Sequence, residues 1–269
     1  MALSYSPALQ NYVAQTGSWK NFFDNGHIEI RTGTKPATAN LAVTGTLLAT
    51  ITASAATKTD EVLGTGVVTL SDTLSGSVDT LTVMAIDILG GAVTHTGSIA
   101  TTADAVVLKV NRNPANTLVT ASNVLGVITL TALPGLGVTL NSGALTFTAT
   151  TATAVVTSTT FGSGTGGSVV GVAAANGLKM DYNAAAGVMT KDITQTWSGT
   201  AVGAGTQTAG WFRYISSVAD AGALDSSAVY LRLDGSIATS GADMNFSSTS
   251  ITSGALQTLS TFSFTVPAA

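Results

Sequence analysis

The sequence has 269 residues, of which 45% are hydrophobic and only 9% are charged, with a net charge of −4 at pH 7. Ordinary soluble domains carry roughly 25% charged residues, and the absence of a basic cluster argues against a nucleic-acid partner. The chain has no cysteine, which excludes disulfides and thiolate metal sites, while its 29 glycines and its many Val and Thr residues favour strands and tight turns.

The mean hydropathy of +0.42 does not by itself indicate a membrane protein. The apolar runs are short and are broken by Thr, Ser, Asn and Gly, so none approaches the ~20 residues of a spanning helix. The N-terminal stretch MALSYSPALQNYVAQ has neither the basic region nor the apolar region of a signal peptide. We therefore expect no membrane partner and no signal peptide.

The N-terminal segment is the one clear helix that precedes the sheet. Ser6-Pro7 places a capping residue before a proline at the first helical position. Gly17 interrupts the helical pattern, and Asp24–Gly26 ends it. Two strands are predicted next, HIEIR with strict alternation and then Gly45–Thr52. The apolar residues at near-helical spacing are Leu9, Tyr12, Val13, Trp19, Phe22 and Phe23.

From about Ala55 the composition shifts towards Val, Thr and Gly with few aromatic residues. The pattern predicts a strand over Asp79–Ile88 and a short helix over Thr101–Asn113, with Thr101 and Asp104 at capping-box spacing. Further strands are expected, and a glycine-rich hinge at Gly162–Gly167 would close the segment. These strands span 116–122, 126–132 and 143–161.

The last third has the clearest strand patterns. Gly210–Ser216 is predicted as a strand, and so is Thr261–Val266, which Pro267 would end. Over Ala228–Gly235, Asp234-Gly235 is the strongest hairpin signal of the chain. Alternation in that stretch predicts Val229, Leu231 and Leu233 facing the core, with Tyr230, Arg232 and Asp234 facing solvent.

No segment carries convincing catalytic or cofactor chemistry. Gly162–Gly167 matches G-x-G-x-x-G, but a glycine-broken segment follows it and Asp181 lies too close to serve as the ribose-binding acid. His27 and His95 lie in different segments without metal-ligand spacing, so both are interpreted as solvated surface residues. No nucleophile elbow is present, and acids such as Asp72 sit at turns.

The stretch Leu231–Gly254 raises the question of a metal or sugar-binding loop. Asp234, Asp243 and Asn245 lack the alternate spacing and the final Glu of a calcium loop. Turns explain these residues better. The sequence therefore predicts no catalytic residue, no cofactor-binding residue and no metal-binding residue.

Two long runs contain no Asp, Glu, Lys, Arg or His, namely Asn113–Leu178 and Met244–Ala269. A free monomer normally keeps charge on its surface for solubility. One interpretation is a surface of Ser, Thr and Asn side chains, and the other is that subunit contacts cover much of it, since interface cores are poor in charge. In the second case Thr129 and Thr148 would lie in subunit contacts.

Three stretches of the chain are informative when they are taken together, namely HIEIRTGTKPATANLAVTGTLLATIT, GTAVGAGTQTAGWFRYISS and LRLDGSIATSGADMNFSSTSITSGALQTLSTFSFTVP. They resemble, in the same order, stretches of a family of small virion structural proteins of tailed bacteriophages and prophages. The resemblance covers roughly 1–54 and 187–269. It implies no catalytic residue.

Members of this family lack the middle of the chain, from Ala55 to about Ala186. That segment in turn resembles modules of phage tail and fibre proteins. We therefore expect a mainly β protein. Residues 1–54 and 187–269 would form a discontinuous parent domain, an antiparallel, jelly-roll-like β-sandwich with an N-terminal helix. Residues 55–186 would form an inserted, small β-rich (α+β) module with one short helix.

The resemblance implies a non-enzymatic virion protein, a head decoration or cement protein that stabilises the capsid. The alternatives are a tail, neck or collar component and a host-surface or glycan-binding adhesin. Its expected partners are copies of itself, as a homo-oligomer and by analogy a trimer, and major capsid or tail proteins. Few aromatic residues in the inserted segment, only Phe147 and Phe161 over 57–177, count against the adhesin.

Overall fold

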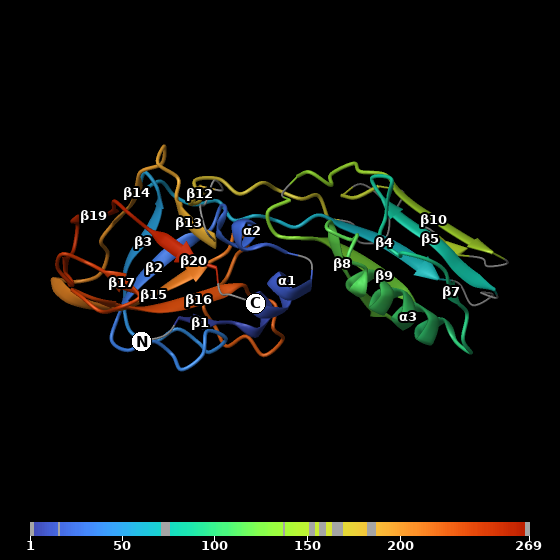
Figure 1. Ribbon diagram of the computed structural model, residues 1–269, viewed down its shortest axis with the longest axis horizontal. Coiled ribbons are helices and arrows are strands. Elements are labelled where there is room, and N and C mark those ends of the chain that lie inside the picture. Colours follow the sequence, from blue (N-terminus) through green and yellow to red (C-terminus); the bar gives the residue numbers. More distant parts are fainter. Residues whose placement is uncertain are drawn as a thin grey trace. The chain divides into compact units, whose positions relative to one another are not determined.

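The computed structural model describes residues 3–15, 17–70, 76–136, 138–150, 154–155, 160–162, 169–181 and 187–266. The protein is mainly β, with 42% strand and 12% helix, and its sheets are largely antiparallel. Figure 1 labels its helices and strands in chain order. The predicted fold class, a β-sandwich-like protein with an N-terminal helix, is confirmed.

The chain divides into two compact units. Unit 1 comprises Met1–Ala14, Ser18–Asp60 and Ala174–Ala269, and unit 2 comprises Glu61–Ala173 together with Gln15–Gly17. The predicted insertion, 55–186, extends beyond unit 2 on both sides. Its outer parts belong to unit 1 because Thr59 exchanges backbone hydrogen bonds with Ala175, and because Met180–Asp181 pairs with a strand of unit 1.

Unit 1 is built on a large sheet in which strands distant in sequence are neighbours. The order is β1-β16-β15-β2-β3-β14-β19, with β17 paired to β16 and β18 paired to β15 (Figure 1). These strands are β1 (Ser4–Tyr5), β2 (His27–Thr32), β3 (Leu47–Ala53), β14 (Trp197–Thr200), β15 (Thr206–Ile215), β16 (Arg232–Ala238), β17 (Met244–Asn245), β18 (Ser250–Thr252) and β19 (Leu256–Leu259).

A smaller sheet and two helices complete unit 1. The sheet has the order β12-β13-β20, formed by Met180–Asp181, Val188–Lys191 and Ser263–Thr265. The helices are α1 (Pro7–Gln15) and α2 (Trp19–Phe23). As predicted, Ser6 caps α1, since its Oγ accepts a hydrogen bond from the Leu9 N–H at 3.2 Å.

Aromatic side chains form the centre of the unit 1 core. Phe22 and Phe23 of α2 are buried, and the Phe23 ring lies 4.9 Å from the rings of both Tyr214 and Phe264. The Tyr214 hydroxyl donates a hydrogen bond to the Phe23 carbonyl. The predicted alternation in the C-terminal strand is confirmed, because Phe264 faces this core while Ser263 and Thr265 are exposed.

The predicted hairpin at Asp234-Gly235 is wrong. β16 runs straight through both residues, and Gly235 does not have the positive φ that a type I′ turn requires. The predicted facing is right for Leu231 and Leu233, which are buried. It is wrong for Arg232 and Asp234, which are fully buried, and for Val229, which is 63% exposed. The local turn signal is overridden because Asp234 is held inside by an ion pair with Arg213.

Unit 2 contains two further four-stranded sheets. One has the order β11-β4-β9-β8, and the other has the order β10-β5-β6 with β7 paired to β5. Their strands are β4 (Thr65–Leu70), β5 (Ser77–Val83), β6 (Ile86–Asp87), β7 (Val93–Thr94), β8 (Val119–Val124), β9 (Val127–Ala132), β10 (Leu145–Thr150) and β11 (Ala154–Val155).

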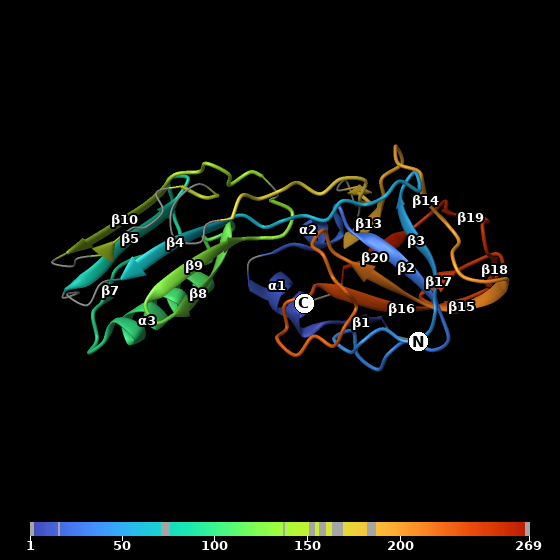
Figure 2. The same ribbon diagram turned by 180° about the vertical axis from the view of Figure 1, so that it is seen from behind.

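The predicted helix of the insertion is α3 (Ile99–Arg112), which lies along β8 and β9 in both views (Figure 1, Figure 2). Val106 and Val110 are buried in the unit 2 core, whereas Leu108 is 49% exposed. The predicted capping box is wrong, because Ser98 is the N-cap and its side chain accepts a hydrogen bond from the Thr101 N–H.

The single strand predicted over Asp79–Ile88 is a hairpin instead. Met84 and Ala85 turn the chain with φ of 50° and 65°, and β5 pairs with β6 across them. Within the predicted strand 143–161, the structure describes β10 and β11. Most of the predicted glycine-rich hinge, residues 163–167, lies outside the described residues, and so do Asp72 and Pro267.

Candidate functional site

The two histidines are not the solvated surface residues that the sequence predicts. The Nδ1 atom of His27 is buried without a hydrogen-bond partner among the described residues. Burial, and secondarily the positive charge of Lys58, lowers the pKa of His27 to about 4. His95 is half-buried in an otherwise exposed loop, with Nδ1 2.9 Å from the Thr102 Oγ1. Each histidine thus has a structural environment within its own unit.

The acids of the Leu231–Gly254 stretch serve as local structural anchors. Asp243 accepts hydrogen bonds from the N–H and the hydroxyl of Ser236 at 2.8 and 2.7 Å. Asn245 accepts one from the Ala242 N–H. Across the described parts of the chain, no group of three or more His, Asp or Glu residues is placed to hold a metal ion.

Two buried ion pairs stabilise the sheet of unit 1, one between the neighbouring strands β15 and β16 and the other between β16 and a loop. Arg213 and Asp234 are fully buried and bind each other through two bonds of 2.7 Å. Arg232 binds Asp220 in the same two-pronged way, at 2.5 and 2.6 Å. The Arg213 guanidinium also donates to the carbonyl of Leu41. Both ion pairs thus have a structural role. Within the described structure, the Arg213 Nη1 is buried without a hydrogen-bond partner.

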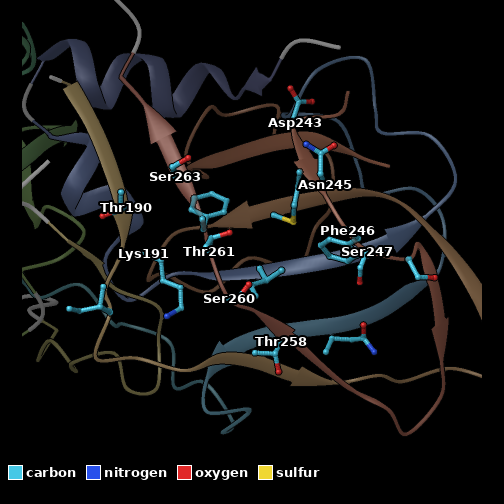
Figure 3. Close-up of a pocket in the computed structure, with 16 residues that line it drawn as sticks. Thr190, Lys191, Asp243, Asn245, Phe246, Ser247, Thr258, Ser260, Thr261 and Ser263 are labelled. Atoms are coloured by element: carbon cyan, nitrogen blue, oxygen red, sulfur yellow. The ribbon is translucent and has the colours of Figure 1, made fainter. Parts of the chain in front are cut away.

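Unit 1 has an open groove of about 870 Å³, which we call the hydroxyl groove. Figure 3 shows Asn245, Phe246 and Ser247 beside a second segment that carries Thr258, Ser260 and Ser263. The complete lining is Thr190, Lys191, Ile193, Asp243, Met244, Asn245, Phe246, Ser247, Ser248, Gln257, Thr258, Leu259, Ser260, Thr261, Phe262 and Ser263.

The hydroxyl groups of this groove are available for a ligand. Among the described residues, none of the side-chain hydroxyls of Ser247, Thr258, Ser260, Thr261 and Ser263 has a hydrogen-bond partner within the protein, and all five residues are exposed. Each hydroxyl can donate one hydrogen bond and accept two. The groove thus offers a dense set of neutral donors and acceptors.

The charged residues of the groove are engaged elsewhere. The Lys191 ammonium donates to the backbone carbonyls of Asp192 and Gln195 and lies 6.0 Å from the Trp197 ring centroid. The Asp243 carboxylate is held by Ser236. Two half-buried aromatic rings, Phe246 and Phe262, add apolar surface. The groove is therefore polar, nearly neutral in character and partly aromatic.

A second candidate surface is the outer face of the β8–β9 hairpin in unit 2, which we call the neutral face. Cross-strand pairing places Thr120 beside Thr131, Ser122 beside Thr129, and Val124 beside Val127. All six residues are exposed or half-buried, and Thr65 and Thr69 of β4 continue the rows. The neutral face carries no charged residue.

The free edge of β8 is covered by side chains rather than left open. The Asn111 amide donates to the carbonyl of Ala121 at 2.9 Å and accepts from its N–H at 2.8 Å. Asn116 bonds Val119 in the same way. These side chains occupy the backbone N–H and C=O groups of Val119 and Ala121, which could otherwise pair with a strand of another molecule. An interface in this region would therefore involve the neutral face.

The sequence predicts Thr129 of the neutral face to lie in a subunit contact, but it does not predict the hydroxyl groove, whose lining lies only partly in a charge-free run. The hydroxyl groove combines segments around residues 190, 245 and 260, which no local motif connects. Comparison with known protein families, with curated proteins and with solved structures finds no match to this chain. None of the described helices is long and apolar enough to cross a membrane.

Proposed function

We propose that this chain is a non-enzymatic structural protein of a tailed-bacteriophage virion, a head decoration protein that packs against itself and the capsid. The observation that carries the proposal is the neutral face. A solvated sheet surface normally bears charges that keep a protein monomeric and soluble, whereas Thr120, Ser122, Val124, Val127, Thr129 and Thr131 bear none. Such a surface fits repeated subunit contacts.

The family resemblance supports the same proposal. Its three stretches contribute β2 and β3, β15, and β16, and these are consecutive neighbours in the order β16-β15-β2-β3. Motifs separated by more than a hundred residues thus belong to one sheet. A shared folding unit is a stronger basis for a family relationship than short matches scattered over unrelated elements.

The proposal is tested with lysine variants. Thr129→Lys places a charge on the neutral face, where burial against a partner costs several kcal/mol but exposure to water costs little. Leu108→Lys, on the exposed side of α3, is the matched control. Thr148→Lys places a charge at an exposed position of β10, in the other sheet of unit 2, which the charge-free run also predicts to lie in a subunit contact. We expect Thr129→Lys to lower incorporation into particles at least tenfold while the control is incorporated normally.

The measurement is the amount of each variant in gradient-purified particles from the bacterial strain that encodes the chain, with thermal melting of the isolated protein as the check on folding. Sedimentation of the isolated wild type reports whether it forms the expected homo-oligomer. Normal incorporation of both Thr129→Lys and Thr148→Lys would contradict the proposed contact surface. A protein that never enters particles would contradict the virion role itself.

The alternative location is a tail, neck or collar, for which the same neutral face would serve. Immunogold labelling of the particles distinguishes the two locations. Label on the head supports decoration, and label confined to the tail or collar supports the alternative.

A further inference from the structure

We propose that the hydroxyl groove of unit 1 binds a neutral carbohydrate, such as the uncharged polysaccharide of a bacterial surface. This inference concerns a different surface from the proposed capsid contact and does not depend on it. The groove has about 870 Å³, which lies in the usual range for ligand sites of roughly 300–1,000 Å³. Because it is open, it suits a chain-like ligand that enters and leaves along its length.

The first argument is the match of hydrogen-bonding groups. Sugars present hydroxyls that both donate and accept, and Ser247, Thr258, Ser260, Thr261 and Ser263 offer hydroxyls with the same dual capacity. Protein partners do not occupy these side chains in the described structure. The amides of Asn245 and Gln257 add two planar groups that donate and accept at the same time.

The second argument is charge. The lining holds one lysine and one aspartate, Lys191 and Asp243, whose opposite charges leave the groove close to neutral. Lys191 already donates to two backbone carbonyls, so the lining offers no cluster of cations for a phosphorylated or uronic-acid polymer. The groove therefore favours an uncharged polyhydroxyl ligand over an acidic one.

The third argument is aromatic surface. The C–H groups on one face of a pyranose ring pack well against an aromatic ring, and Phe246 and Phe262 line the groove while remaining half-buried. Phe262 is tied into the core, with its ring 5.4 Å from that of Trp197. Phe246 has no aromatic neighbour among the described residues. Phe246 is therefore the residue whose removal tests stacking with least damage to the fold.

An extended peptide is the competing occupant, because β20 and β19 border the groove. Peptides that add to a sheet edge are held by main-chain hydrogen bonds, with pockets for alternate side chains. The groove instead presents many small hydroxyl side chains, which offer donors and acceptors rather than apolar contacts to a peptide side chain. The carbohydrate is thus the better match.

The test uses the full chain on an array of purified bacterial O-polysaccharides and capsular polysaccharides, neutral and acidic. We expect binding to neutral members that does not change between about 50 and about 500 mM salt, because no ion pair is involved. Phe246→Ala and, separately, Ser260→Leu should each weaken binding at least tenfold. The control Leu125→Ser alters an exposed residue of unit 2 and should bind as the wild type does.

Three results would overturn the proposal. The first is a wild-type chain that binds no neutral polysaccharide on the array. The second is binding that survives both groove variants, provided that their tryptophan fluorescence and melting show folded protein. The third is binding to cell-envelope material that is destroyed by protease but not by periodate, which would identify a protein ligand. Particle incorporation is measured separately, so failure here leaves the proposed virion role standing.

Discussion

His27 makes unit 1 sensitive to acid in a way that can be worked out from its environment. Burial lowers the pKa of His27 from 6.5 to about 4, with Lys58 acting in the same direction and Asp60 and Asp220 opposing it. The unfolded chain therefore binds a proton at a higher pH than the folded chain does. Stability from this residue is fully present above pH 6.5 and is lost as the pH falls from 6.5 through 4.

The magnitude follows from the size of the shift. Each pKa unit corresponds to about 1.36 kcal/mol, so the change from 6.5 to about 4 is worth about 3 kcal/mol of unfolding free energy. Below pH 4 the contribution levels off, because both states are then protonated. His27→Gln removes the titration and should flatten this part of the stability profile, whatever its effect on absolute stability.

The assay is urea denaturation at a series of pH values between 7 and 4, followed by tryptophan fluorescence. Trp19, Trp197 and Trp211 all belong to unit 1, so the signal reports on that unit. All other ionisable groups are common to the two proteins, so their contributions cancel in the comparison. If wild type and His27→Gln lose the same free energy between pH 6.5 and 4, the burial assigned to His27 is wrong.

Three further changes test the packing. Gly235→Val should destabilise unit 1 by roughly 1–3 kcal/mol through overpacking, because a Cβ there would lie 2.4 Å from the Phe212 ring; unchanged urea denaturation would refute the close approach. Asp234→Asn should cost about 3–5 kcal/mol in the same assay by leaving the Arg213 charge buried without its partner, and a loss below about 1 kcal/mol would contradict the burial of this pair. Leu125→Asn should stabilise unit 2 by a few tenths to about 1 kcal/mol, because Leu125 is 88% exposed at a φ of 51° that Asn tolerates better; calorimetric melting that shows a lower transition for unit 2 would contradict it.

The alternation of β2 and the N-cap of α1 were predictable because they are local properties. Ile28 and Ile30 are buried while His27, Glu29 and Arg31 are less so, as a two-residue period requires. Ser6 caps α1 because its oxygen reaches an N–H three residues ahead, whatever the rest of the fold does. Such features depend on a few neighbouring residues.

Turns were less predictable because tertiary contacts override the local signal. Asp-Gly at 234–235 looks like a hairpin, but Arg213 pairs with the carboxylate and the Phe212 ring covers the glycine. Conversely, Met84-Ala85 and Leu125-Gly126 form the two-residue turns with positive φ at both positions, although only the second contains the expected glycine.

The candidate sites could not be predicted as surfaces, since they are assembled from separate strands. The charge-free runs contain the six residues of the neutral face and most of the residues that line the hydroxyl groove. Their sequence does not show that Ser247 and Ser260 border one groove, or that Thr120 and Thr131 are cross-strand neighbours. The sequence likewise does not show that the side chains of Asn111 and Asn116 hydrogen-bond the edge of β8.

Imaging of intact, gradient-purified particles by cryo-electron microscopy tests the proposed function most directly. The proposal predicts repeated density on the outer surface of the head that fits this chain, with the β8–β9 face of unit 2 turned towards a neighbouring subunit. Density at the tail or collar would retain a virion role but overturn the decoration role. Particles that contain no density and no peptides from this chain would contradict the virion assignment.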